Sequence, residues 1–341
     1  MNTIAKKKFE EIKDLKKQIP TSDNKQELEN QIIAITEELK ENAIKLFQEP
    51  SHIKTFLDNI GKFNNYSYSN TLLIYLQNPD VKFVAPFKTY KDLGYSVKSN
   101  PDSIKIVIPR FNTIVKDNRS NTLRYYSTLN DDELEIYKDK NNDDIVYHSK
   151  KLSYYSLGTV FDITDTTMPY EEIEEKLHPT VDNENAKDYI TILEDLIKEN
   201  GFNIRYVDKC DSDGYCSFEN KEIVILNSQT DLVKLKVLLH EFAHSLAHTN
   251  LENNYQEYKN DRGRYEVEAE TISYVVSNYL NLQVPEFSEM YLYSWSKNKD
   301  FKELDTSLNT IIKYSTNIIK KIEENNKNIN LEIFNDKSMV N

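Results

Sequence analysis

The chain begins with apolar residues at helical spacing. Residues 1–50 are predicted to form two helices separated near Pro20, and the apolar residues of the second recur about one turn apart among Glu and Lys. Such an amphipathic helix packs against another surface or mediates dimerisation. Its apolar face is formed by Leu28, Ile32, Ile35, Leu39 and Leu46.

A mixed pattern follows as far as about Thr166. A helix is predicted over Tyr68–Gln77, and short β-rich runs such as Lys105–Pro109 come after a stretch punctuated by Pro and Gly. The segment Asp131–Asp144 is charged and poor in apolar residues. It is therefore predicted to be an exposed excursion between strands.

The second half has a clearer order of elements. A helix is predicted from about Ala186 to Asn200, with Gly201 as its stop. Strands are predicted over Phe202–Asp208 and Glu222–Asn227, and another helix over Glu303–Asn325 before a polar tail.

The chain of 341 residues is long enough for two ordinary domains. Residues 168–187 are rich in Glu, Asp, Asn and Pro and are the best candidate linker. The prediction is an α+β protein with a helical segment (1–49), a mixed α/β domain (50–167), the linker, a second domain (188–300) and a C-terminal helix and tail (301–341).

Composition narrows the class of protein. Apolar residues make up 38% and charged residues 29%, and no apolar run approaches the roughly 18 residues that span a bilayer. The N-terminal residues Met1–Lys8 contain no apolar signal core, so a cytoplasmic protein is expected. Cys210 and Cys216 offer only half a structural zinc site and are interpreted as structural or incidental thiols.

Charge is unevenly distributed. The net charge of −13 argues against non-specific nucleic-acid binding by the whole chain. Residues 51–125, however, hold 11 Lys/Arg against 5 Asp/Glu. This basic segment is the part best suited to a polyanion, although such an excess is more often a solvated face.

The strongest chemical signal is His240-Glu241-Phe242-Ala243-His244. Residues four apart share a helix face, so the two imidazoles can bind one ion while Glu241 faces a water on that ion. Ser228 and Asp231 form a capping-box pattern before this helix. Its apolar stripe consists of Leu232, Leu235, Leu239, Phe242 and Leu246.

A chance occurrence of this motif has odds on the order of one in a hundred, so a third ligand is needed to support it. Glu266 and Glu270 lie four residues apart on a following helix, where two like charges would repel each other without a function. Glu266 is predicted to be the third zinc ligand, and Glu270 to support a zinc-bound histidine. His248 competes, but it lies about 12 Å of helical rise beyond His240 and is interpreted as a rim or structural residue.

Zinc bound by these residues predicts peptide hydrolysis. Glu241 would take a proton from the zinc-bound water and deliver it to the leaving amine. The strand Glu222–Asn227 is the predicted edge along which an extended peptide pairs. An oxyanion stabiliser is also needed, and the sequence does not distinguish among three candidates: Tyr265, Arg264 and His248.

Three motifs in order resemble anti-restriction proteins of the ArdC type: Tyr68–Ile74 with Gln77 and Pro79, Phe87–Gly94, and Val160–Thr166. This resemblance, from about Pro50 to Leu280, implies a single-stranded-DNA-binding domain followed by a zincin-like metallopeptidase domain. The second half also resembles the ImmA/IrrE group. Both resemblances place the metal ligands at His240, His244 and Glu266 and the general base at Glu241. The chain departs from the pattern at Lys98–Pro101, and at Tyr90 where Trp is expected.

Single-strand binding needs aromatic faces for stacking and nearby cations for phosphates. The candidates in the N-terminal domain are Tyr66, Tyr68, Lys88, Tyr90, Lys91 and Arg110. The alternative is that these aromatics, at helical spacing, belong to the core.

Three hypotheses follow. The first is a mobile-element-associated protein that binds single-stranded DNA and cleaves a protein or peptide, with an anti-restriction role. The second is a cytoplasmic ImmA/IrrE-like peptidase that cleaves a regulatory protein without a DNA function. The third is a binding protein whose zinc site is structural or vestigial. No membrane partner is expected, and the oligomeric state is left open.

Overall fold

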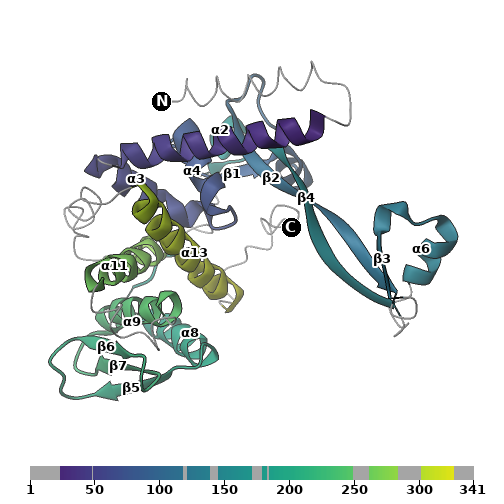
Figure 1. The fold of residues 1–341 in the computed structure, drawn as a ribbon. Helices are drawn as coiled ribbons and strands as arrows, with labels where there is room; N and C mark the ends of the chain where they lie inside the picture. Colours follow the sequence, from purple (N-terminus) through teal and green to yellow (C-terminus); the bar gives the residue numbers. More distant parts are fainter. Residues whose placement is uncertain are drawn as a thin grey trace.

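The computed structural model describes residues 24–47, 49–117, 121–138, 145–170, 179–182, 184–248, 261–282 and 301–325. Helices and a sheet from the first half of the chain lie on one side, and helices with a small sheet from the second half lie on the other (Figure 1). The long helix α13 (Phe301–Asn325) runs between them and contacts α2, α4, α8, α9 and α11. Both halves mix helix and sheet, which confirms the predicted α+β class.

The first described elements are three helices. On α2 (Asn24–Leu46), Ile32 and Leu39 of the predicted apolar face are buried in the main core, and Ile35 packs against it. α2 therefore packs within its own chain. α3 (Pro50–Ile60) and the 3-10 turn η1 (Gly61–Phe63) follow. The first predicted helix and the side chains of Leu28 and Leu46 lie outside the described residues.

The helix α4 (Tyr68–Gln77) has the predicted bounds. It begins after Ser67, whose hydroxyl accepts a hydrogen bond from the backbone N–H of Asn70. The side chains of Asn70 and Gln77 bond the backbone of the neighbouring strand at Val107 and Lys105. These polar contacts hold α4 in register with the first sheet.

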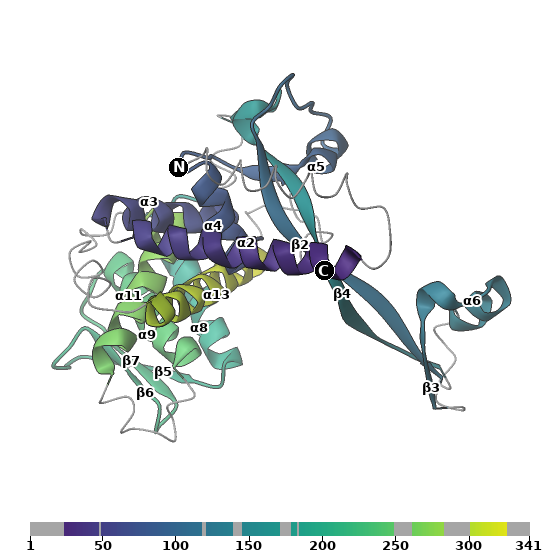
Figure 2. The ribbon, with the colours of Figure 1, turned by 45° about the horizontal axis from the view of Figure 1, so that its top comes forward.

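That sheet is antiparallel, with the strand order β1-β4-β2-β3. β2 (Ser103–Asp117) and β4 (Ile145–Asp162) pair over their whole lengths, and their far ends form an arm that projects from the body (Figures 1 and 2). Near the body, Ile104, Ile106 and Val160 are buried. The shorter strands are β1 (Val84–Pro86) and β3 (Thr122–Tyr125).

Short elements connect the strands: α5 (Phe87–Asp92), η2 (Tyr126–Thr128), α6 (Asp131–Lys138) and η3 (Ile163–Asp165). α6 occupies the first part of the predicted exposed excursion, at the end of the arm (Figure 1). Asp131 and Asp132 are exposed as predicted, but this part is helical. Residues 139–144 lie outside the described residues.

The second half builds a helical layer on a small sheet. α8 (Ala186–Glu199) ends before Gly201, whose φ of +83° is the left-handed stop predicted there. The strands β5 (Asn203–Val207), β6 (Gly214–Ser217) and β7 (Glu222–Leu226) have the order β5-β7-β6. β7 is thus central, and its prediction as the edge for a peptide is wrong. β6, which the sequence analysis did not identify, is an edge.

Two helices complete this layer. α9 (Asp231–Ala247) begins after Thr230, whose hydroxyl accepts a hydrogen bond from the Val233 N–H. The predicted capping box with Ser228 is therefore wrong by two residues. α11 (Arg262–Tyr279) packs against α9. This pair positions all the residues of the predicted metal site.

One hydrophobic core joins the two halves. It contains side chains of α2, α3 and α4 together with side chains of α8, α9, α11 and α13. Polar contacts cross the same boundary: the Tyr68 hydroxyl donates to Asp305 at 2.6 Å, and Asn64 donates to Glu323 at 2.7 Å. In the predicted linker, Met168 and Val181 are buried. The domain limits remain predictions, but the regions they separate share a core.

In the part of the chain that the structure describes, no helix combines the length and the apolar character that a bilayer crossing requires. Cys210 and Cys216 are both free thiols.

Candidate metal centre

The helix pair α9 and α11 brings three ligand groups to one point. His240 and His244 lie one turn apart on α9, and Glu266 faces them from the first turns of α11. The Nε2 atoms of the two histidines are 3.2 Å apart, and Oε2 of Glu266 lies 3.6 Å from His240 Nε2 and 3.5 Å from His244 Nε2. Among the described residues, these three form the group that can hold a metal ion.

These separations fit a tetrahedral ion. Ligand atoms about 2.1 Å from a tetrahedral centre are about 3.4 Å from one another, so the observed triangle matches three corners of such a site. A pocket of about 420 Å³ borders the triangle at His240 and is also lined by Glu241, Glu270, Val237 and Gly214 among others. The candidate site is therefore open to a ligand on the His240 side, and a catalytic metal site needs such an open position.

The carboxylates around His240 favour positive charge. Oε2 of Glu270 lies 3.1 Å from His240 Nδ1, on the side of the ring away from the ligand triangle. Burial lowers the pKa of His240, but hydrogen bonds to Glu266 and Glu270 outweigh it and raise the pKa to about 10. Hydrogen bonds from His240 and His244 hold the pKa of Glu266 well below its usual range. The position that the triad surrounds thus suits a cation.

Glu241 has the properties of a base beside this position. Burial is the largest influence on the pKa of Glu241 and raises it, and the charge of Glu266 raises it further. The charge of His240 and a hydrogen bond from the backbone N–H of Cys216 on β6 lower it in part. The resulting pKa is about 7. A carboxyl group of that pKa is matched to proton transfer at neutral pH. Its contact with β6 also places it beside an edge strand.

His248 lies behind the ligands. It is 2% exposed, and its Nδ1 faces the Nδ1 of His244 at 3.1 Å rather than the ligand triangle. The interpretation of His248 as a rim residue is therefore wrong, and the structural alternative holds. Arg264 and Tyr265 contact each other next to it, so their candidacy as oxyanion donors stays a prediction.

The three tyrosines predicted to bind DNA lie in the core. Tyr90 is 0% exposed and donates to the carbonyl of Phe161, Tyr68 donates to Asp305, and Tyr66 donates to the carbonyl of Val84. Tyr68 and Tyr90 thus offer no ring face for stacking, and that prediction is wrong. The alternative from the sequence analysis, that aromatics at helical spacing belong to the core, is correct for these two residues. The cations Lys88, Lys91 and Arg110 are exposed.

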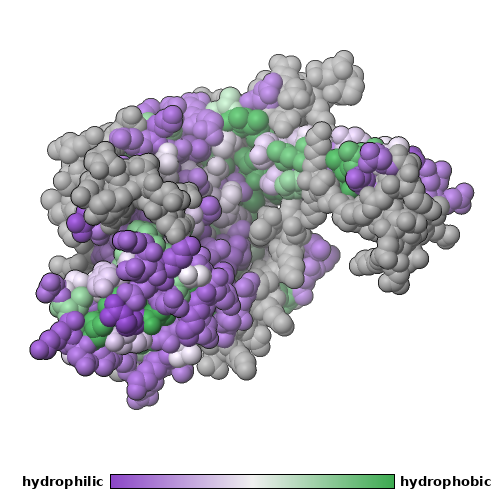
Figure 3. Space-filling model, turned by 60° about the horizontal axis from the view of Figure 1, so that its bottom comes forward, coloured by the Kyte–Doolittle hydropathy of each residue, from purple (hydrophilic) through white to green (hydrophobic). Residues whose placement is uncertain are grey.

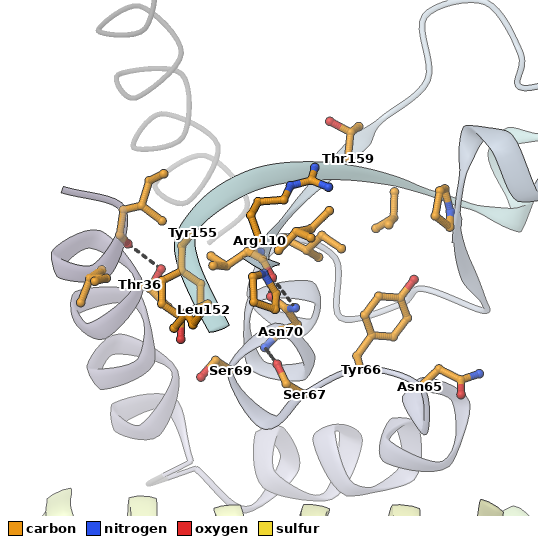
Figure 4. Close-up of a pocket in the computed structure, with 18 of the residues that line it drawn as sticks. Thr36, Asn65, Tyr66, Ser67, Ser69, Asn70, Arg110, Leu152, Tyr155 and Thr159 are labelled. Atoms are coloured by element: carbon orange, nitrogen blue, oxygen red, sulfur yellow. Dashed lines mark hydrogen bonds between the residues drawn. The ribbon is translucent and has the colours of Figure 1, made fainter. Parts of the chain in front are cut away.

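A second pocket, of about 960 Å³, lies between α2, the segment before α4, and the strands β2 and β4 (Figure 4). Of the six predicted DNA contacts, Tyr66 and Arg110 line it. The sequence analysis missed Phe111, Leu152 and Tyr155, which line it as well. Phe111 pairs across the strands with Leu152, and these two are 39% and 42% exposed.

A β-bulge lies in the wall of this pocket. Residues 106–111 of β2 all line the pocket. The register of β2 on β4 shifts between Arg110 and Phe111, an irregularity of the kind that bends a strand locally. An apolar band extends over the projecting arm (Figure 3), where Leu123 is also exposed. A cation, an aromatic ring and an apolar surface thus meet at one place.

The helix pair, its ligand triad and the small sheet define a metallopeptidase-like domain, and residues 198–311 match the model of the IrrE N-terminal-like domain of peptidase family M78. Residues 22–161 match the model of the N-terminal domain of anti-restriction factor ArdC. The chain therefore combines an ArdC-type N-terminal domain with an IrrE-like peptidase domain. The resemblance predicted from the three sequence motifs is confirmed.

Individual relatives are distant. The chain is 26% identical over 328 residues to the uncharacterized protein pXO2-81 of Bacillus anthracis, covering 89% of this chain and 53% of that protein. The chain thus spans about half the length of this relative. Among solved structures, it is similar to the antirestriction protein ArdC of plasmid R388.

The metal-free form of that protein has a TM-score of 0.40 with 15% identity, covering 76% of this chain and 85% of the other. The Mn(II)-bound form has a TM-score of 0.42 with 16% identity, covering 77% and 86%.

Proposed function

We propose that this protein binds single-stranded DNA through its N-terminal domain and hydrolyses peptide bonds at a zinc ion held by His240, His244 and Glu266, in an anti-restriction role in the cytoplasm. The observation that carries the proposal is the ligand triangle together with Glu241, which lines the same pocket as His240. The His₂Glu donor set suits zinc, the ion that such sites hold in metallopeptidases. The two free thiols are consistent with a reducing compartment.

In the peptidase half, each residue has a distinct task. When bound, the zinc ion would polarise the scissile carbonyl and acidify a water molecule. Glu241 accepts the proton of the attacking water and delivers it to the leaving amine, a shuttle that suits its pKa of about 7. The peptide substrate pairs with β6, the edge strand whose Cys216 N–H contacts Glu241.

In the DNA half, the pocket beside β2 and β4 is the binding site. Phe111 and Tyr155 offer rings for base stacking, and Arg110 offers a cation next to Phe111. Nε of Arg110 donates to Ser156 at 2.9 Å, which orients the guanidinium. Lys88, Lys91 and the basic excess of residues 51–125 add attraction for phosphates.

The peptidase half is tested by incubating zinc-loaded protein with host-cell proteins and unstructured protein substrates. Wild type should cleave at least one of them, and Glu241→Gln should retain zinc but lose cleavage. The matched control is Glu219→Gln, an exposed glutamate in the turn after β6, which should cleave normally. Equal cleavage by wild type and Glu241→Gln would show that this site is not the source of the activity.

The DNA half is tested by fluorescence anisotropy with a labelled single-stranded oligonucleotide over a salt series. Binding should weaken steeply as salt increases, because phosphate contacts release counterions. No binding by folded protein at low salt would remove this half of the proposal.

A second candidate function is an IrrE-like peptidase that cleaves a regulatory protein without binding DNA. The match of residues 198–311 to the IrrE-like domain favours it. It predicts zinc-dependent cleavage that oligonucleotide leaves unchanged, together with the absence of DNA binding in the anisotropy assay.

A further inference from the structure

Three buried polar side chains lie behind the metal ligands and have no task in the proposed hydrolysis. His248, Glu268 and Ser307 are 2%, 4% and 0% exposed. Burying an ionisable group costs free energy unless its partners compensate for the lost water. The contacts of these three residues therefore indicate what the group does.

The three side chains form a continuous path of hydrogen bonds that starts at a metal ligand. Nδ1 of His244 lies 3.1 Å from Nδ1 of His248, and Nε2 of His248 lies 3.1 Å from Oε2 of Glu268. The Ser307 hydroxyl donates to Oε1 of Glu268 at 2.5 Å. Each of the helices α9, α11 and α13 contributes to this path.

The protons along the path have one consistent direction. If Nε2 of His244 binds the metal ion, its proton is on Nδ1 and is donated to Nδ1 of His248. The proton of His248 is then on Nε2 and is donated to Glu268. Both imidazole tautomers are thus set by a single buried carboxylate.

The other histidine ligand, His240, contacts a carboxylate directly rather than through a second histidine. Its Nδ1 lies 3.1 Å from Glu270 directly, whereas His244 reaches Glu268 through His248. A single helix, α11, therefore supplies the ligand Glu266 and a carboxylate behind each histidine ligand. This explains why three glutamates alternate along its sequence.

We propose that His248 and Glu268 are positioning residues that fix the tautomer and orientation of His244 for metal binding. The inference rests on the proposed metal site. Groups that orient metal ligands in this way contribute about tenfold to a hundredfold to metal affinity. The competing explanation is packing alone, because the ring of His248 also contacts Tyr265 and Glu268 forms an ion pair with Arg264 at 3.6 Å.

The two explanations differ in what the variants change. Dissociation constants for Zn²⁺ and Mn²⁺ are measured by calorimetry on the metal-free full chain, together with its unfolding temperature. His248→Phe should weaken metal binding about tenfold to a hundredfold, and Glu268→Gln should weaken it less. Ser315→Ala is the matched control, because Ser315 is an equally buried serine on α13 that bonds only the backbone of its own helix.

A packing role predicts lower unfolding temperatures with dissociation constants within about twofold of wild type, and that result overturns the proposal. If His248→Phe does not fold, Glu268→Gln and Ser307→Ala decide the question by the same criterion. The visible spectrum of bound Co²⁺ should also change in Glu268→Gln and not in Ser315→Ala, and identical spectra contradict the proposal. If wild type binds neither ion, it is the proposed metal site that fails.

Discussion

The metal centre and the arm of β2 and β4 differ in how their side chains are held. In the candidate metal centre, two helices that contribute to the shared core hold the three proposed ligands, Glu270 is hydrogen-bonded to His240, and the buried His248 is hydrogen-bonded to His244. On the arm, Phe111, Leu152 and Leu123 are exposed. The first region holds its side chains through buried and hydrogen-bonded contacts, whereas the second presents apolar side chains at the surface.

Changing a metal ligand should have the largest effect. Glu266→Ala removes one of three ligands and should weaken zinc binding on the order of a hundredfold or more, measured by metal analysis after dialysis against a chelator. Glu219→Ala, an exposed glutamate outside the site, is the control and should retain zinc. Retention of zinc by both variants would remove Glu266 from the site.

The second prediction concerns the stability that the shared core contributes. Leu239 of α9 is 0% exposed in the core that both halves share, so Leu239→Ala should lower the free energy of unfolding by about 2–5 kcal/mol. Leu123 on the arm is 68% exposed, and Leu123→Ala should change it by less than about 0.5 kcal/mol. Denaturant titration measures both. Similar losses for the two variants would contradict the difference in packing.

For single-stranded DNA binding, we expect the exposed arm residue to matter and the buried core residue not to matter. Phe111→Ala should weaken single-strand affinity by about 1–3 kcal/mol, the range for one stacked base, with little effect on stability. Tyr90→Phe removes a buried hydroxyl and should lower stability slightly while leaving DNA affinity unchanged. Fluorescence anisotropy measures the affinity, and a loss with Tyr90→Phe alone would place the DNA site elsewhere.

The smallest effect concerns pH. Burial raises the pKa of Glu323, which accepts a hydrogen bond from Tyr279 and, across the two halves, one from Asn64. A carboxyl group with a raised folded-state pKa stabilises the fold below its unfolded pKa, and this stability is lost as pH rises through the folded pKa. Glu323→Gln keeps the accepting oxygen and does not ionise.

The unfolding temperature of Glu323→Gln, relative to that of wild type, should therefore rise as the pH increases from about 4 to about 8. The exposed Glu324→Gln serves as the control. A gap that stays constant with pH would show that Glu323 does not titrate in the folded protein.

Local patterns in the sequence were sufficient to predict α4 and the candidate ligand set. The predicted bounds of α4 match the structure, in which Ser67 caps the helix, and the spacing of His240 and His244 depends only on helical geometry. Glu266 required a second helix, but its spacing from Glu270 was a usable signal.

Features that depend on distant pairing could not be obtained in this way. β7 is central because β5 and the short strand β6 pair with its two edges. The residues Gly214–Ser217 contain no pattern that predicts a strand. The larger pocket is lined by side chains of β2 and β4 that strand pairing brings together, such as Phe111 and Leu152. Tyr68 and Tyr90 were misassigned because helical spacing does not reveal which face of a helix a neighbouring element covers.

The most direct test of the account is anomalous diffraction from crystals of the zinc-loaded protein, because it locates the ion and its ligands together. We predict one strong zinc peak about 2.0–2.2 Å from His240 Nε2, His244 Nε2 and a carboxylate oxygen of Glu266, with Glu241 beside the fourth position. A zinc peak at other residues, or a fully loaded crystal with no peak at this triangle, would contradict the account.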